Sequence, residues 1–189
     1  MTSRNRRTRL LSRFHRAERG ATAVEFALVA LPFLILLFGI VELAMVFIVS
    51  TTLEGATESA SRRIRTGEFQ TGGATTKQDF KNLVCARMSW LKAGCDASLS
   101  VDVRTFNDFS SLAASPQLDP VLFDPTNTCW STGQPTDIVL VRTYFRWKLF
   151  TPLLDSALQN SVNGERLINA VSAFRNEPYN SNPAGGAKC

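Results

Sequence analysis

Residues Phe26 to Val49 read FALVALPFLILLFGIVELAMVFIV, a run of 24 residues whose single formal charge is Glu42. As a helix this run is about 36 Å long, whereas the hydrocarbon core of a membrane is about 30 Å thick. A secretory signal peptide has a shorter apolar region, about 7 to 15 residues, closed by a small-x-small cleavage site. The run is longer and has no such site at its end, so it predicts a membrane-spanning helix that remains in the mature protein.

The residues that precede this run are strongly basic. Residues 1 to 20 contain seven arginines and one acidic residue, Glu18, so their net charge is +6. The whole chain has a net charge of +5, so the other 169 residues together carry −1. Excess arginine stays on the cytoplasmic side of a membrane, which predicts a cytoplasmic N-terminus and an outer location for everything after about Ser50. This position beside an apolar run argues against nucleic acid as a partner. The arginines are Arg4, Arg6, Arg7, Arg9, Arg13, Arg16 and Arg19.

Four cysteines follow the apolar run: Cys85, Cys95, Cys129 and Cys189. An even number on the outer side of a membrane predicts two disulfides. Three pairings are possible, and we favour Cys85 with Cys95 and Cys129 with Cys189, because the first pair is close in sequence and the second would hold a long loop and the C-terminus. The spacing fits no zinc motif, and the only histidine, His15, lies on the other side of the membrane. We therefore expect no metal ion and no cofactor.

Helical periodicity continues beyond the apolar run. It predicts one helix from Ala21 to about Arg65, stopped at Gly67, with the stretch GEFQTGGAT as a flexible joint. Thr76 to Asp79 has the pattern of a capping box and opens a second predicted helix that ends before Gly94. The apolar positions of the two helices are Leu53, Ala56, Ala60 and Ile64 in the first, and Phe80, Leu83, Val84, Met88 and Leu91 in the second.

Three later segments have the alternation or the composition of strands: Leu99–Phe106, Asp137–Leu149 and Arg166–Phe174. They predict an antiparallel sheet covered by the second helix. The aromatic residues of the second strand should divide between core and surface by alternation. These aromatics are Tyr144, Phe145 and Trp147.

The chain is thus expected to have three parts: a basic leader (1–20), the membrane helix with its extension (21–66), and a small disulfide-braced α+β domain (67–189). Within the last part, residues 107–136 hold four prolines and no period. A stretch of this length without regular structure usually has a purpose, so we interpret it as a functional or disulfide-pinned surface loop.

We find no catalytic residues in the outer part of the chain. It has no histidine, no GxSxG, no HExxH and no glycine-rich phosphate loop, so neither a Ser-His nor a zinc mechanism can be assembled. Asp119, Asp124 and Asp137 lie beside or near prolines and fit turns and a strand start better than an acid/base pair. The sequence predicts that the protein is not an enzyme.

The stretch Arg19–Glu25, RGATAVE, joins the basic leader to the apolar run. Taken alone, Gly20 is accepted at a helix N-cap, and Glu25 in the first turn meets the positive end of the helix dipole. The complete arrangement resembles a type IV prepilin, with its basic leader, its glycine, its glutamate five positions later and its unbroken apolar helix. That resemblance implies cleavage by a prepilin peptidase between Gly20 and Ala21, on the cytoplasmic side.

The resemblance narrows further to the TadE/TadG-like pseudopilins of the tight-adherence (Tad) pilus. It covers the block RGATAVEFALVALPFLILLFGIVELAMVF and the outer segments CARMSWLKAGC, VDVRTF, IVLVRTYFRW and FRNEPY. It implies a structural protein of pilus biogenesis in the bacterial inner membrane, with a periplasmic domain that contacts other Tad pilins and the assembly platform. Ala21 stands where many type IVa pilins have an aromatic residue or methionine, so N-methylation is not carried over.

Two charged groups of the helix have predicted roles, Glu25 from the resemblance and Glu42 from its depth in the apolar run. A new amine at Ala21 would be costly in an apolar helix bundle unless paired, and Glu25 can pair with it. Glu42 lies about 10 Å inside the outer end of the run, where an ionisable group usually marks an interface. We expect it to contact another membrane helix, with Gly39 on the same face allowing close approach. Pro32 either kinks the helix or is tolerated within it.

A second interpretation stays open. The chain could be an uncleaved single-pass protein whose outer domain binds a ligand or an envelope partner through the loop 107–136. Whether the mature chain begins at Ala21 distinguishes the two.

Overall fold

The computed structural model describes residues 18–73, 76–115, 119–151, 155–161 and 164–180. The chain forms two compact units, residues 1–42 and 43–189. The boundary between them falls inside one helix, α2 (Glu18–Arg65). The predicted fold class, a long apolar helix followed by a small α+β domain, is confirmed.

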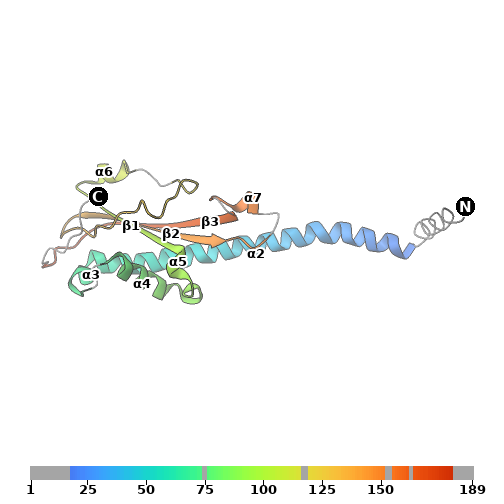
Figure 1. Cartoon of the computed structure of the whole chain (residues 1–189), viewed down its shortest axis with the longest axis horizontal. Helices are drawn as coiled ribbons and strands as arrows, with labels where there is room; N and C mark the ends of the chain where they lie inside the picture. Colours follow the sequence, from blue (N-terminus) through green and yellow to red (C-terminus); the bar gives the residue numbers. More distant parts are fainter. Residues whose placement is uncertain (1–17, 74–75, 116–118, 152–154, 162–163, 181–189) are drawn as a thin grey trace, which may run out of the picture. The chain divides into compact units, whose positions relative to one another are not determined.

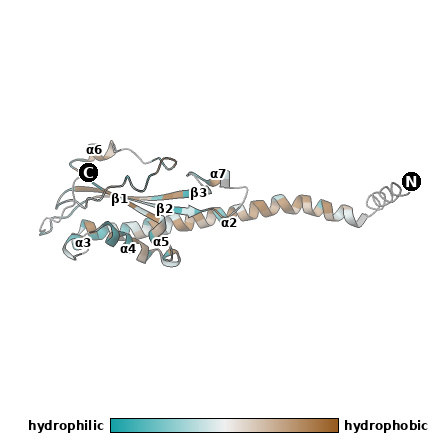
Figure 2. Cartoon of the chain, in the orientation of Figure 1, coloured by the Kyte–Doolittle hydropathy of each residue, from teal (hydrophilic) through white to brown (hydrophobic). Residues whose placement is uncertain are grey.

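In the first unit, α2 exposes its apolar side chains. Phe26 is 74% exposed, and the other large apolar residues up to Val41 are also exposed, except Ile35, which is partly buried. Figure 2 shows this part of the helix in the hydrophobic colour. The helix is continuous through Pro32, and it starts at Glu18, three residues before the predicted start, while its end at Arg65 matches the prediction.

The second unit is built on a three-stranded antiparallel sheet in the order β1-β2-β3 (Figure 1). Its strands are β1 (Leu99–Phe106), β2 (Ile138–Lys148) and β3 (Glu165–Arg175). Both ends of each strand were predicted to within one residue. Alternating apolar positions and β-branched residues fit the pleated, partly buried surface of a sheet, and both can be read from neighbouring residues in the chain. The register pairs Val103 with Val141, and Val141 with Ser172.

The second half of α2 covers one face of this sheet. The side chains that the sequence analysis placed on its apolar stripe are buried there, together with Val49. Thr57 and Thr143 share a buried hydrogen bond of 2.7 Å between their hydroxyl oxygens, and the hydroxyl of Ser172 donates to Glu58 Oε2 at 2.8 Å. The domain core therefore includes residues of the same helix that carries the apolar run.

The second helix, α4 (Lys77–Arg87), starts as predicted. Thr76 accepts a hydrogen bond from the backbone N–H of Asp79, and the Asp79 carboxylate accepts from the backbone N–H of Thr76. The helix ends earlier than predicted, because Ser89 adopts a φ of 50° and opens the short helix η1 (Ser89–Leu91). Met88 and Leu91 are still buried. The apolar pattern therefore predicted correctly which side chains are buried, but it did not predict where the helix ends.

Replacing Thr76 by alanine should destabilise the domain by about 1 kcal/mol, because it removes the acceptor for the N–H of Asp79. The measurement is denaturant unfolding of the full chain in detergent micelles. Thr51→Ala is the control, since Thr51 is exposed and its hydroxyl donates to the backbone carbonyl of Ile48 within α2. An equal change in both variants would contradict the role of the cap.

The first part of the expected flexible joint after α2 is instead a short helix, so the prediction is wrong for this part; residues 74–75 of the joint lie outside the described residues. Residues Glu68–Thr71 form the short helix α3, and Phe69 is only 2% exposed. Its ring lies edge-on to Phe80 and Trp130, with centroid distances of 6.1 and 5.9 Å. A single aromatic residue that finds distant partners thus fixes a stretch that is otherwise rich in glycine and polar residues.

The other face of the sheet is also covered, which corrects the expected alternation in β2. Tyr144 points to this face and is buried, because Phe123 from the loop 107–136 stacks on it at 4.6 Å. The loop also contains α6 (Phe109–Ala113). Its Asp119 and Asp124 accept hydrogen bonds from the backbone N–H two residues later, at 2.9 and 2.8 Å, which confirms them as turn residues.

Two short helices complete the described elements of the second unit: α5 (Cys95–Ser98) precedes β1, and α7 (Asp155–Leu158) lies between β2 and β3 in the chain.

Candidate functional site

The predicted processing site lies in the first turn of α2. Because the helix begins at Glu18, the peptide between Gly20 and Ala21 is helical, and Gly20 is not the N-cap. A Cβ added at Gly20 would meet no atom within 4 Å. The first four N–H groups of a helix have no partner within it, so this turn can unwind at low cost to give a protease an extended chain.

Glu25 is exposed and lies one turn beyond Ala21. Residues four apart share one face of a helix, so an amine created at Ala21 would be on the same side as the Glu25 carboxylate. On a different face of the same part of α2, Ala23, Ala27 and Leu31 line part of an apolar groove of about 390 Å³. The segment therefore combines an acidic group with a smooth surface that a neighbouring helix could approach.

Glu42 differs from its neighbours along α2. Its side chain is fully buried, whereas Val41 and Leu43 on either side are about half exposed. Gly39 on the same face is partly buried. The chain itself therefore removes this carboxylate from the surface, which the sequence could not show. Contact of Gly39 and Glu42 with another helix stays a prediction.

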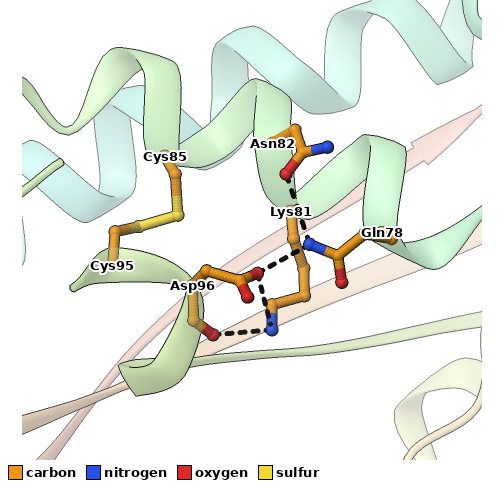
Figure 3. The surroundings of a disulfide bond; sticks show 6 residues. All are labelled: Gln78, Lys81, Asn82, Cys85, Cys95 and Asp96. Carbon is orange, nitrogen blue, oxygen red and sulfur yellow. Dashed lines mark hydrogen bonds and ion pairs between the residues drawn. A yellow bond between two sulfur atoms is a disulfide. The ribbon is translucent and has the colours of Figure 1, made fainter. Parts of the chain in front are cut away.

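The first predicted disulfide is present between Cys85 and Cys95, whose Cα atoms are 5.7 Å apart (Figure 3). It ties the end of α4 to the start of α5. Cys189 lies outside the described residues, so its pairing with Cys129 stays a prediction. Among the described residues no cysteine is a free thiol.

A polar cluster braces this disulfide from the same two helices. Gln78 Nε2 and Lys81 Nζ lie 2.7 and 3.1 Å from Asp96 Oδ1 (Figure 3). These contacts lower the pKa of Asp96, with the hydrogen bond from Gln78 contributing most. A depressed carboxylate pKa means that the cluster favours the folded state above the usual carboxylate range and loses this effect as the pH falls through the lowered pKa.

Asp102 is a structural residue that the sequence analysis missed. Its carboxylate is fully buried in β1, accepts from the backbone N–H of Cys129 at 2.7 Å and from Arg104 Nε at 3.0 Å. The next residue, Trp130, forms an isolated parallel β-bridge with Val103, so the end of the loop 107–136 runs beside β1. The only signal in the sequence was a charged residue inside the alternating segment VDVR.

Lys77, at the start of α4, also contacts the end of the loop 107–136. Its Nζ donates to Thr128 Oγ1, and partial burial lowers the pKa of Lys77. The contacts of Asp102 and Lys77 therefore hold the loop 107–136 to the rest of the second unit. In the part of the chain that is described, no three His, Cys, Asp or Glu side chains are grouped as a metal site would need.

One helix among the described residues, Gly20–Arg65, is long and apolar enough to cross a membrane. Residues 20–62 match the family of TadE-like proteins. This match covers most of α2 and none of the sheet. No curated protein and no solved structure matches the chain.

Proposed function

Since the chain is TadE-like over residues 20–62, we propose that it is a pseudopilin that takes part in assembling the adhesive Tad (Flp) pilus. The observation that carries the proposal is the first part of α2, where nearly all large apolar side chains up to Val41 are exposed in the single chain. Such a surface needs lipid or other apolar helices. A pilin helix moves between these two environments.

The leader supports a prepilin-type precursor. The peptidase would cut between Gly20 and Ala21, where a helix end can unwind and where no packed side chain obstructs access. The new amine would then be paired by Glu25, from the same chain or from a neighbour. Pairing with a neighbour would set the axial register of subunits, because an unpaired charge in an apolar bundle is costly.

The proposed location is the bacterial inner membrane, with a single span, a cytoplasmic N-terminus and a periplasmic domain. The arginine-rich leader supports this orientation, and the Cys85–Cys95 disulfide supports an oxidising compartment for the domain. Other Tad pilins, the prepilin peptidase and the assembly platform are the proposed partners. The role is assembly, without catalysis.

The experiment is a deletion of the gene in its native host, with pili sheared from the cell surface and quantified. We expect the sheared pilus fraction to fall at least about tenfold, as for loss of an obligatory assembly component, and to return when the wild-type chain is supplied. Complementation with Glu25→Gln should restore less than complementation with the wild type, and Glu54→Gln, on the exposed outer part of α2, is its matched control. Unchanged pili in the deletion strain would overturn the proposal.

A second candidate is an uncleaved anchored protein that binds a ligand or an envelope partner through the loop 107–136. Three apolar side chains in this loop are well exposed, namely Phe109, Val121 and Leu122. In that case, replacing Val121 and Leu122 by serine would abolish function while the N-terminal leader and the pili remained intact.

A further inference from the structure

One end of the domain gathers aromatic and basic side chains. Trp90 and Trp147 contact each other edge to face, with ring centroids 6.1 Å apart. Trp90 is 51% exposed and Phe150 is 52% exposed, although both are large aromatic residues. Lys92, two residues after Trp90, and Lys148, directly after Trp147, are also exposed. We call these five residues the interfacial end.

The interfacial end borders an open cleft of about 540 Å³. Leu91, Phe145, Trp147, Lys148 and Phe150 are among the residues that line it. The cleft thus joins η1, α5 and the last residues of β2 into one surface, and the side chains that line it are mostly apolar with a basic margin.

The position of this surface along α2 follows from hydrogen bonds within the second unit. Thr57 bonds to Thr143, Glu58 bonds to Ser172, and the backbone of Arg65 accepts from that of Glu177. Residue numbers thus rise together along α2 and β3, so β2, antiparallel to β3, runs the opposite way. Later residues of β2 therefore lie beside earlier residues of α2.

The level of Trp147 can then be estimated. It is four residues after Thr143, about 13 Å along an extended strand. The same distance is about nine residues of helix, so Trp147 lies near residue 48 of α2. The apolar run ends at Val49, and Phe47 and Ile48 are still exposed. The tryptophan pair is therefore level with the outer end of the apolar run.

The charges at this level are mainly positive. Besides Lys92 and Lys148, Arg146 is exposed and donates to the carbonyl of Ala97. Two carboxylates are near: Asp96 is already paired with Lys81, and Glu165 lies opposite Lys148 in the β2–β3 register. Among the described residues, neither Lys92 nor Arg146 forms an ion pair with a carboxylate, so the surface favours an anionic layer.

We propose that the interfacial end rests in the outer headgroup layer of the membrane that α2 crosses. The tryptophan rings lie at the boundary between hydrocarbon and headgroups, where tryptophan is enriched in membrane proteins, and the lysines bind anionic phospholipid headgroups. This inference rests on the membrane topology given under the proposed function. It fixes the domain against the bilayer by a second contact besides its helix.

The test uses the full chain in lipid nanodiscs whose phosphatidylcholine carries bromine on the acyl chains near the headgroup, with phosphatidylglycerol as the anionic lipid. Bromine quenches tryptophan that touches lipid. Trp130→Phe leaves only Trp90 and Trp147. The double variant Trp90→Phe with Trp147→Phe leaves only Trp130, which packs among Phe69 and Phe80 in the core.

We expect bromine to lower the emission of the Trp130→Phe variant about twofold, as for tryptophan at a membrane interface, and to leave the emission of Trp130 unchanged. Omitting phosphatidylglycerol, or introducing Lys92→Glu together with Lys148→Glu, should reduce the quenching of the Trp130→Phe variant. Quenching that does not depend on either would overturn the headgroup contact.

A separate variant distinguishes this inference from the topology on which it rests. Phe33→Trp, in a chain with all three native tryptophans replaced by phenylalanine, reports whether α2 lies in the bilayer. Quenching of that residue without quenching of Trp90 and Trp147 would overturn the inference and leave the proposed function intact. No quenching at residue 33 would remove the membrane span itself.

Discussion

Gly20→Arg should abolish proteolytic processing: we expect the wild-type chain isolated from its native membrane to begin at Ala21 and the variant to retain residues 1–20. A prepilin-type peptidase needs an extended and unhindered peptide at the cut, and a large side chain before the scissile bond blocks it. The structure makes this a clean test, because a side chain at Gly20 meets no neighbouring atom within 4 Å. Intact-mass and N-terminal peptide mass spectrometry measure the result.

The matched control is Gly55→Ala, at a second glycine of α2 where an added Cβ is equally unobstructed. This variant should be processed like the wild type. An intact N-terminus in the wild-type chain would remove the processing claim and reduce Gly20 and Glu25 to residues at the start of a helix. The uncleaved anchored protein would then be the better account.

Phe80→Ala should cost about 3–5 kcal/mol of unfolding free energy, the range for removing a buried aromatic ring. Phe80 is fully buried, and its ring lies 6.1 Å from that of Phe69 and 5.7 Å from that of Trp130. Its removal would open a cavity between α3, α4 and the strand-like end of the loop 107–136. Denaturant unfolding of the full chain in micelles, followed by Trp130 fluorescence, gives the value.

Phe109→Ala is the control for this loss, since Phe109 is 60% exposed in α6. Its effect should stay within about 0.5 kcal/mol, as for most surface substitutions. A loss below about 1 kcal/mol for Phe80→Ala would contradict a tightly packed aromatic centre.

The parts of the fold that could be predicted from sequence are those decided by neighbours in the chain. The alternation in LSVDVRTF predicted both ends of β1 correctly. The capping pattern of Thr76 and Asp79 predicted the start of α4, where their reciprocal hydrogen bonds are found. Apart from the ends of two helices, the failures concern partners from other parts of the chain. Phe69 is held by Phe80 and Trp130, and Tyr144 is covered by Phe123.

The same division holds for the candidate site. Gly20, Ala21 and Glu25 were found from a local motif, and their processing and pairing roles stay predictions. The Asp102 carboxylate was missed because its acceptor role depends on Cys129, 27 residues later. The burial of Glu42 was missed because a run of apolar letters does not tell lipid from protein as the surroundings of a side chain.

The sharing of α2 between the two units has a consequence for proteolytic shedding. Val49, Leu53, Ala56, Ala60 and Ile64 belong to the domain core, although they precede the domain boundary that composition suggests. A protease that cut in the segment between α2 and α3 would leave the sheet without the helix that covers one of its faces. The released fragment would expose apolar surface and be degraded, so the domain cannot be shed as a stable soluble form by a cut at that place.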